Sequence, residues 1–178
     1  MASLTQRMIG AAKLDAATYE EVEADTTATP QAMLVVVLAS VAAGFGVLRV
    51  VGIGGLLIAA LASLIGWYVW AFITYFVGTR FLPGSKTQAD MGQLLRTIGF
   101  SASPGLIRVL GIVPGLDMLV SFVAALWMLV TMVVAVRQAL DYESTGRAVA
   151  VCLIGLIFNF VVLFVLSKLL GVPLGVAP

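Results

Sequence analysis

Histidine is absent from this sequence of 178 residues, and cysteine occurs once, at Cys152. A single cysteine excludes an intramolecular disulfide. Without histidine there is no Cys/His metal site, no Ser-His or Cys-His nucleophile and no histidine proton relay. The sequence also lacks a GxSxG motif, a pair of intramembrane carboxylates and an Asp/Glu cluster with metal-ligand spacing. We therefore expect no catalysis, no metal ion and no cofactor.

Charge is equally scarce, because only 11% of the residues are charged and ten basic against nine acidic residues leave a net charge of +1. So small a net charge gives no field that would attract nucleic acid. By contrast, 61% of the residues are hydrophobic, whereas a soluble domain has about 45–50%. This composition predicts an all-α, polytopic integral membrane protein whose first partner is the lipid bilayer.

The first 29 residues hold the longest polar stretch and form a predicted cytoplasmic N-terminal segment. Apolar residues recur at helical spacing over residues 4–12, which predicts a short amphipathic helix on the membrane surface. A solvated connector with frayed helical turns is the alternative. Thr18 and Glu21 match a capping box and predict that a second helix begins there. No apolar run follows the first residues, as a secretory signal requires, so we expect the segment to be retained.

Uncharged apolar runs predict about five membrane spans in the remaining domain, residues 30–178. Four of the runs are long enough to cross a hydrocarbon core of about 30 Å at 1.5 Å per residue. Thr29 and Pro30 provide an N-cap and a first helical residue for the first span. The spans are expected near 30–48, 56–79, 98–114, 118–138 and 147–168.

The third of these spans is the least regular, because Ser103, Pro104, Gly111 and Pro114 interrupt it. Lipid cannot satisfy the backbone groups that such residues free, so we predict a short or broken helix surrounded by protein or water. This segment also carries Arg108. It could line a ligand or ion pathway, dock a partner, or form a plain short helix from which Arg108 reaches an interface. A re-entrant path instead of a span stays open.

Three polar residues within the membrane domain are candidate structural or pathway residues. Arg108 and Asp117 are nine residues apart across the Pro114-Gly115 turn, so we expect them to form a structural ion pair. In a transporter they would instead serve an anionic substrate or proton coupling. Asn159 is the strongly polar side chain of the fifth span, and we expect it to hydrogen-bond another helix rather than a substrate.

Small residues repeat every four positions in the second span, at Gly55, Ala59 and Ser63. Such a stripe lets another helix approach closely, which is how helices associate in lipid. We therefore predict a homo-oligomer, or a complex with another membrane protein, that packs through this stripe.

The basic residues predict the orientation of the chain. With five spans and a cytoplasmic N-terminus, seven basic residues lie inside and three outside, which favours an N-inside and C-outside topology. A re-entrant third segment would change the count to five against five and leave the orientation undetermined. The inside residues are Arg7, Lys13, Arg80, Lys86, Arg96, Arg137 and Arg147, and the outside residues are Arg49, Arg108 and Lys168.

Two stretches of the chain resemble a known family. Residues 12–22 read AKLDAATYEEV, and residues 94–104, within the region before the fourth span, read LLRTIGFSASP. These stretches, with Trp127 and Arg137 in the fourth span, resemble the bacterial branch of the YIP domain family, named for proteins that interact with Ypt/Rab GTPases. The resemblance implies a five-helix integral membrane domain with a cytoplasmic N-terminus, here in the bacterial cytoplasmic (inner) membrane.

The same resemblance bears on partners. Eukaryotic members act in vesicle trafficking by binding GTPases and each other. The long cytoplasmic N-terminal region typical of those members is not found before the first span here, so GTPase binding rests on the resemblance alone. The family carries no established catalytic residues.

Together these observations predict a noncatalytic integral membrane protein that acts in membrane organisation or as a partner-binding scaffold. The alternative is a small transporter or permease-like protein with a pathway near the broken third helix. No duplicated pattern of interrupted helices relates the two halves of the chain, as it does in inverted-repeat transporters.

Overall fold

The computed structural model describes residues 2–45, 48–113 and 115–170, and within these ranges leaves aside the side chains of residues 48–51, 159 and 162–170. The described residues form helices and their connections, with no strand among them, so the predicted all-α fold is confirmed. The elements are α1 (Leu4–Ala12), α2 (Ala16–Ala24), the 3₁₀ helix η1 (Thr26–Ala28), α3 (Thr29–Gly44), α4 (Leu48–Phe76), the π-helix η3 (Val77–Phe81), α5 (Met91–Ser101), the 3₁₀ helix η4 (Ser103–Ile112), α6 (Asp117–Ala139) and α7 (Thr145–Leu170).

Three helical stretches are long and apolar enough to cross a membrane: Thr26–Gly44, Gly52–Phe81 and Asp117–Ala139. They correspond to the first, second and fourth predicted spans. The described apolar part of α7, Thr145–Phe158, is shorter. The chain is therefore a polytopic membrane protein, and the total of five spans stays a prediction.

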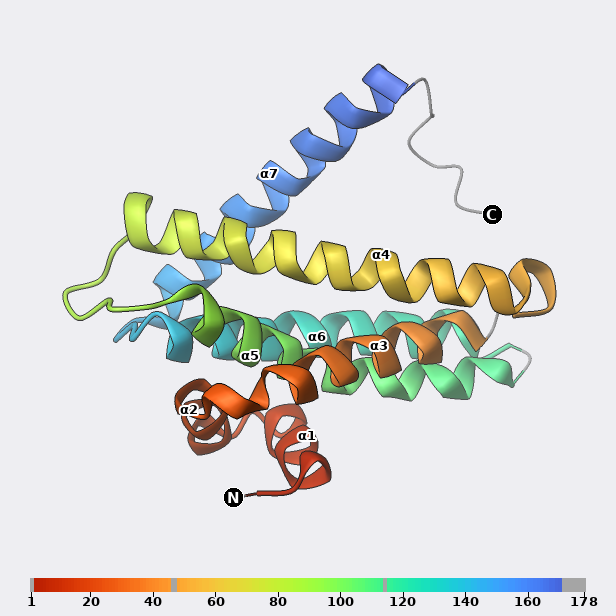
Figure 1. Ribbon diagram of the computed structural model, residues 1–178, viewed down its shortest axis with the longest axis horizontal. Helices are drawn as coiled ribbons and strands as arrows, with labels where there is room; N and C mark the ends of the chain where they lie inside the picture. The colour runs from red at the N-terminus through yellow and green to blue at the C-terminus, as the bar shows by residue number, and fades with distance from the viewer. Residues whose placement is uncertain (1, 46–47, 114, 171–178) are drawn as a thin grey trace.

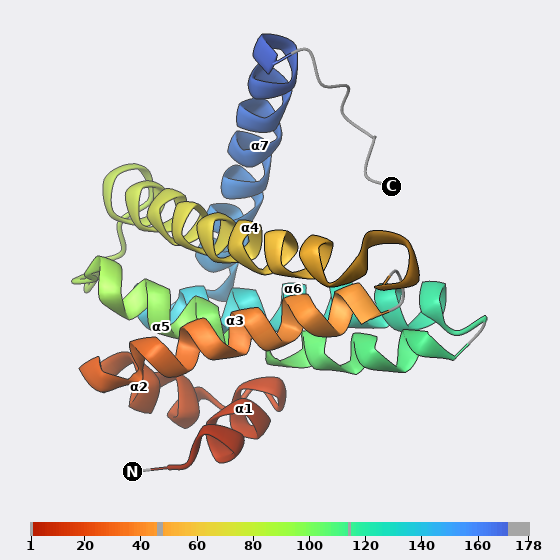
Figure 2. The same ribbon diagram turned by 45° about the vertical axis from the view of Figure 1, so that its right-hand side comes forward.

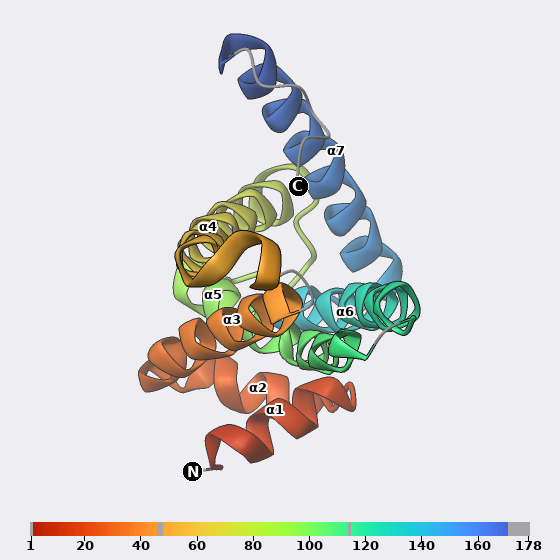
Figure 3. The same ribbon diagram turned by 90° about the vertical axis from the view of Figure 1, so that its right-hand side faces the viewer.

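The helices are arranged as a bundle with additions on two opposite sides (Figures 1 and 2). α3 and the α5–η4 pair run in one direction along the bundle, whereas α4 and α6 run in the other. Seen along the bundle, α1 and α2 cover one side and α7 leaves α6 on the other side, past α4 (Figure 3). Large apolar side chains on α4, α6 and α7 are exposed, as expected of surfaces that face lipid.

α3 begins within one residue of its predicted start, with Pro30 in its first turn, where the missing N–H costs no hydrogen bond. A face of small residues on α3 then packs closely against α5. A Cβ placed on Gly99 of α5 would lie 2.6 Å from the Cβ of Ala32 and 3.2 Å from its backbone. The α3–α5 crossing therefore depends on having no side chain at residue 99.

A glycine precedes the second span at Gly52, which has φ 65° and interrupts the α4 segment. A left-handed φ of this kind is strained for residues with a Cβ, so glycine is required at this position. The helix beyond Gly52 continues without charge as far as Phe76.

The third segment is broken, as predicted, and the membrane span expected over residues 98–114 stays a prediction. Helix α5 already begins at Met91, because Asp90 and Gln93 form a capping box, and the break comes at Ala102. η4 then continues to Ile112 as a 3₁₀ helix, a geometry that rarely persists beyond three or four residues. At about 1.5 and 2.0 Å per residue the pair reaches about 36 Å. It is therefore long enough to cross the hydrocarbon core.

The N-terminal helices are docked on the bundle, which excludes the alternative of a frayed, solvated connector. The Tyr19 hydroxyl is buried and donates to the Ala11 carbonyl at 3.1 Å, joining α2 to α1. The Trp127 indole of α6 donates to the Ala12 carbonyl at 2.7 Å. The capping box predicted at Thr18 is wrong, because Asp15 caps α2 and the helix already begins at Ala16.

Candidate functional site

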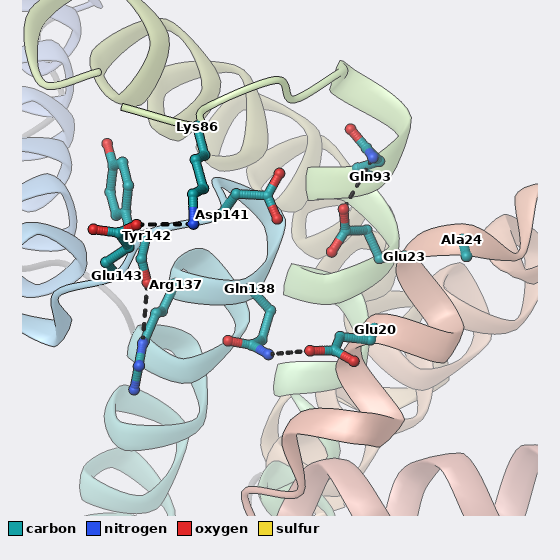
Figure 4. Close-up of a pocket in the computed structure, with 10 residues that line it drawn as sticks. All are labelled: Glu20, Glu23, Ala24, Lys86, Gln93, Arg137, Gln138, Asp141, Tyr142 and Glu143. Atoms are coloured by element: carbon teal, nitrogen blue, oxygen red, sulfur yellow. Dashed lines mark hydrogen bonds and ion pairs between the residues drawn. The ribbon is translucent and has the colours of Figure 1, made fainter. Parts of the chain in front are cut away.

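A polar pocket of about 590 Å³ lies where α2, the α4–α5 connection, the start of α5 and the α6–α7 loop meet (Figure 4). We call it the acidic pocket, because four carboxylates and two basic side chains line it. Its lining residues are Glu20, Glu23, Ala24, Lys86, Gln93, Arg137, Gln138, Asp141, Tyr142 and Glu143.

The α2 side of the acidic pocket is held to the bundle by two side-chain amides. Gln138 of α6 donates to Glu20 at 3.1 Å, and Gln93 of α5 donates to Glu23 at 2.9 Å. Figure 4 shows both pairs, with α2 on the side of the pocket opposite the α6–α7 loop. The two carboxylates are thereby fixed at the pocket edge.

A buried arginine of the bundle also reaches into α2. The Arg96 guanidinium of α5 donates from Nε to the Val22 carbonyl at 2.9 Å, and from Nη2 to the Glu23 carbonyl. These carbonyls belong to the last turn of α2, where helical partners are lacking. Arg96 therefore satisfies the end of α2 and ties it to α5.

A second buried arginine joins the three N-terminal elements to one another. Arg7 of α1 has a side chain that is 1% exposed, and it donates to Glu21 at 3.0 Å, to Asp25 at 2.6 Å and to Gln31 of α3 at 3.0 Å. Hydrogen bonds from Thr27 and Arg7 lower the pKa of Asp25 to about 2. The segment that precedes the first span is thus part of the folded unit.

The opposite wall of the acidic pocket is the loop that follows α6. Asp141 adopts φ 51°, while the Tyr142 N–H bonds the Arg137 carbonyl and the Asp141 N–H bonds that of Gln138. This pattern is a Schellman motif, in which glycine is the usual left-handed residue. The buried Tyr142 hydroxyl donates to the carbonyls of Gly78 and Leu82 at 3.1 and 2.7 Å, which anchors the loop to η3 and the residues after it.

The charges of the acidic pocket are only partly balanced within the chain. Arg137 is engaged by the Tyr142 carbonyl and by Thr145, each at 3.2 Å, and the exposed Lys86 pairs with Glu143 at 3.1 Å. Among the described residues no donor reaches the Asp141 carboxylate. The pocket therefore keeps free anionic acceptors.

Glu23 is the carboxylate most affected by this surplus. Burial, followed by the negative charge of Asp141, raises the pKa of Glu23 from 4.5 to about 7, and nearby Arg96 opposes part of the rise. Glu20 and Asp90 raise it further. Protonation of this one side chain therefore falls near neutral pH.

In the part of the chain that the structure describes, no three His, Cys, Asp or Glu side chains are grouped as a metal site requires. The acidic pocket offers carboxylate and amide oxygens on an open surface. Its chemistry is therefore that of binding a cationic group.

The predicted ion pair between Arg108 and Asp117 is not formed, since the three ion pairs of the described residues involve neither. Arg108 lies in η4, one 3₁₀ turn before Gly111. Asp117 begins α6 and packs its backbone on Gly111, with its Cα 3.4 Å from the position that a Cβ would take there. Arg108 instead lines a cavity together with Trp70 and Met128.

The other predicted site residues lie on two different helices. Asn159 is in α7, and its side chain lies outside the described residues. On α4, Gly55 and Ser63 are half-buried and Ala59 is exposed, so the stripe runs along the border between the packed and the lipid-facing sides. The structure therefore leaves Ala59 accessible to another helix.

The residues of the acidic pocket were not singled out from the sequence. They come from three regions about 50 to 70 residues apart in the chain, and none belongs to a motif with a regular spacing. The one local signal is the polar run Asp141-Tyr142-Glu143, which by itself indicates only a loop.

The comparison with protein families gives one clear result: the family model of the Yip1 domain matches residues 16–166. The chain belongs to the Yip1 domain family. No curated protein and no solved structure matches it. The match begins within the N-terminal segment, at the first residue of α2, so the helix that builds one wall of the acidic pocket is part of the Yip1 domain. The Yip1 family is a non-enzymatic membrane protein family.

Proposed function

We propose that this Yip1-family protein is a noncatalytic membrane scaffold that binds a partner protein through the acidic pocket. The partner would present a segment rich in Lys or Arg, because the free groups of the pocket are carboxylates. The observation that carries the proposal is the unbalanced charge at Asp141 and Glu23 in a pocket of about 590 Å³ built by three separate regions of the chain.

The conformation of Asp141 supports the same proposal. A residue with a Cβ at a left-handed position carries strain that glycine would avoid, and such strain tends to be found at functional sites. Here the strained residue also directs an unpartnered carboxylate to the pocket. A purely structural loop would be served better by glycine.

We further propose that the acidic pocket faces the cytoplasm of a bacterial cell, with the chain in the inner membrane. Lys86, Arg96, Arg137 and Arg147 lie at or near the end of the bundle that carries the pocket. Arg147 donates to the Pro83 carbonyl at 3.0 Å, which brings the α6–α7 loop beside the α4–α5 connection. An excess of basic residues at one end favours the inside.

The proposal is tested by a photoreactive amino acid at Ala24, an exposed residue of the pocket. We expect a discrete protein adduct in native membranes that is lost in Asp141→Asn and at about 1 M salt, where the screening length falls to about 3 Å. The matched control places the same probe at the exposed Ile9 of α1, outside the pocket. Identical adducts from both positions, or adducts that persist in Asp141→Asn, would refute pocket binding.

Self-association through α4 is the second part of the proposed scaffold. Replacing Ala59 with Leu puts a large side chain on the small-residue stripe and should reduce dimer crosslinking in membranes severalfold, since close approach drives helix association in lipid. Gly54→Leu is the control, because Gly54 is exposed on another side of α4 with nothing within 4 Å of its Cβ position. Equal crosslinking in both variants would exclude the stripe.

A transporter is the alternative function, and one observation favours it: Arg108 lines a cavity beside the broken third segment. In that case Arg108→Gln would fold normally and abolish uptake of an anionic substrate into vesicles. The scaffold proposal expects that the same variant leaves the Ala24 adduct intact.

A further inference from the structure

A second cavity, of about 340 Å³, lies among α4, η4, α6 and α7. Small-molecule sites in proteins occupy about 300–1,000 Å³. Its walls are mostly apolar and come from α6 and α7, with Trp70 of α4 and Arg108 of η4 as the polar exceptions. The other lining residues are Ala125, Met128, Leu129, Met132, Cys152 and Leu156.

Both polar residues of this cavity leave a buried donor without a partner. The Nε of Arg108 and the indole Nε1 of Trp70 are buried and make no hydrogen bond. None of the ion pairs of the described residues includes Arg108. A guanidinium in apolar surroundings is costly unless an anion or water satisfies it. Two unsatisfied donors on one cavity therefore indicate a missing acceptor.

The geometry holds Trp70 firmly at this cavity. A Cβ placed on Gly155 of α7 would come within 3.3 Å of the Trp70 ring, so glycine at this position lets α7 pack directly on the indole. On the other side, Gly105 of η4 lies where a Cβ would be 3.0 Å from the sulfur of Met128. The elements that carry the two donors are thus packed closely around the cavity.

The location of the cavity selects the kind of anion. Trp70 lies within the candidate span Gly52–Phe81, and Met128 and Met132 lie within the candidate span Asp117–Ala139. A site that opens between spanning helices is reached from the lipid phase more readily than from water. The anion must then carry its own apolar part, as a membrane lipid does.

We propose that this cavity binds the anionic headgroup of a membrane lipid. Arg108 would pair with a phosphate oxygen, for which the planar guanidinium is well suited, and Trp70 would donate a further hydrogen bond. The acyl chains would lie along the apolar walls formed by α6 and α7. This site is separate from the acidic pocket and does not depend on the proposed partner binding.

Native mass spectrometry of the full chain in detergent tests the proposal, with dilauroyl phosphatidylglycerol as the anionic probe and dilauroylglycerol, which has the same acyl chains and no phosphate, as the neutral reference. We expect adducts with phosphatidylglycerol at a roughly tenfold lower lipid concentration than with the neutral reference, because one charge-assisted pair strengthens binding by about that factor. Arg108→Gln should remove that preference and Arg108→Lys should keep part of it. Arg80→Gln, which removes an exposed arginine at the end of η3, should change nothing.

Ala125→Phe covers the case in which Arg108→Gln fails to fold. This change narrows the cavity from α6 while it keeps the arginine, so the preference should fall although the charge is intact. Equal adducts for the two lipids in the unmodified chain, or a preference that survives Ala125→Phe, would overturn the proposal. Displacement of the phosphatidylglycerol by inorganic phosphate would overturn the lipid as occupant and indicate a site for free anions, as the transporter alternative requires.

Discussion

Arg7 is fully buried and Arg108 is half-buried, and the two arginines have different surroundings. Arg7 lies under the N-terminal helices and donates to two carboxylates and one amide, at 2.6 to 3.0 Å. Arg108 lies beside spanning helices and forms no ion pair among the described residues, whereas the buried Nε atom lacks a partner in both arginines. The first arginine completes the fold from within the chain, whereas the second requires an acceptor from outside it.

This difference separates the molecule into two functional regions. The N-terminal helices and the bundle end pair or hydrogen-bond their buried arginines within the chain and leave carboxylates free, so this region suits a cationic partner. The Arg108 cavity leaves a cation and an indole N–H free, so it suits an anion. Changes to the buried contacts of the N-terminal helices should therefore have the largest effects, and changes to the carboxylates of the acidic pocket should have smaller ones.

Removal of the Arg7 guanidinium should have the largest effect. In Arg7→Met, Glu21 and Asp25 lose their shared cation. We expect the equilibrium constant for docking of α1 and α2 on the bundle to fall roughly 10- to 100-fold. Faster cleavage of residues 4–24 in limited proteolysis would show this. Lys13→Met removes an exposed cation of the same segment and should leave the cleavage rate unchanged. A cleavage rate equal to that of the unmodified chain in Arg7→Met would contradict the role of Arg7.

The close α3–α5 crossing supports the same region. Gly99→Ala places a methyl group 2.6 Å from the Cβ of Ala32, and such overpacking costs about 2 kcal/mol. Thermal unfolding in detergent measures this loss. Gly54→Ala adds the same methyl group to α4 in open space and should stabilise the protein by about 0.5 kcal/mol. A Gly99→Ala variant as stable as the unmodified protein would show that the crossing tolerates a side chain.

Glu23 makes the docking of α2 dependent on pH. Its pKa is raised from 4.5 to about 7 in the folded state, so its contribution to stability is complete below pH 4.5 and is lost as the pH rises through 7. Glu23→Gln should abolish this loss, which we put at about 1 kcal/mol because solvent screens a half-exposed carboxyl.

The measurement is the melting temperature at pH 5 and pH 8. The difference between the two should shrink in Glu23→Gln and persist in Glu143→Gln, an exposed carboxylate of the same pocket. If the melting temperature of Glu23→Gln keeps its full pH dependence, other titratable groups cause that dependence.

Asp141 should give the smallest effect. Asp141→Gly removes the strained left-handed conformation of a residue with a Cβ and should stabilise the loop by about 0.5 kcal/mol. Asp141→Ala removes the same charge but keeps the strain. The difference between the two melting temperatures therefore measures the contribution of the left-handed backbone conformation alone. If Asp141→Gly is less stable than Asp141→Ala, the loop does not carry the proposed strain.

The sequence predicted the features that depend on neighbouring residues. Uncharged runs located the three long spanning helices, Pro30 indicated the start of α3, and Ser103 and Pro104 indicated the break in the third segment. Local capping was less reliable, because the capping box predicted at Thr18 is not formed and Asp15 caps α2 instead.

Contacts between distant residues were beyond such patterns. The partners of Arg7 lie 14, 18 and 24 residues along the chain, and nothing in their spacing shows that α1 and α2 fold back on the bundle. The expected pair of Arg108 and Asp117 failed because the 3₁₀ geometry of η4 could not be predicted from sequence. That geometry places Gly111, rather than Arg108, beside Asp117.

Hydrogen exchange of the backbone amides of α2, residues 16–24, in lipid nanodiscs tests most directly the claim that the N-terminal helices are part of the folded domain and build the acidic pocket. The account predicts that these amides are protected to a degree similar to those at the end of α6, and that Arg7→Met removes the protection from α1 and α2 but not from α6. Exchange of α2 at the rate of an unstructured peptide in the unmodified chain would contradict it.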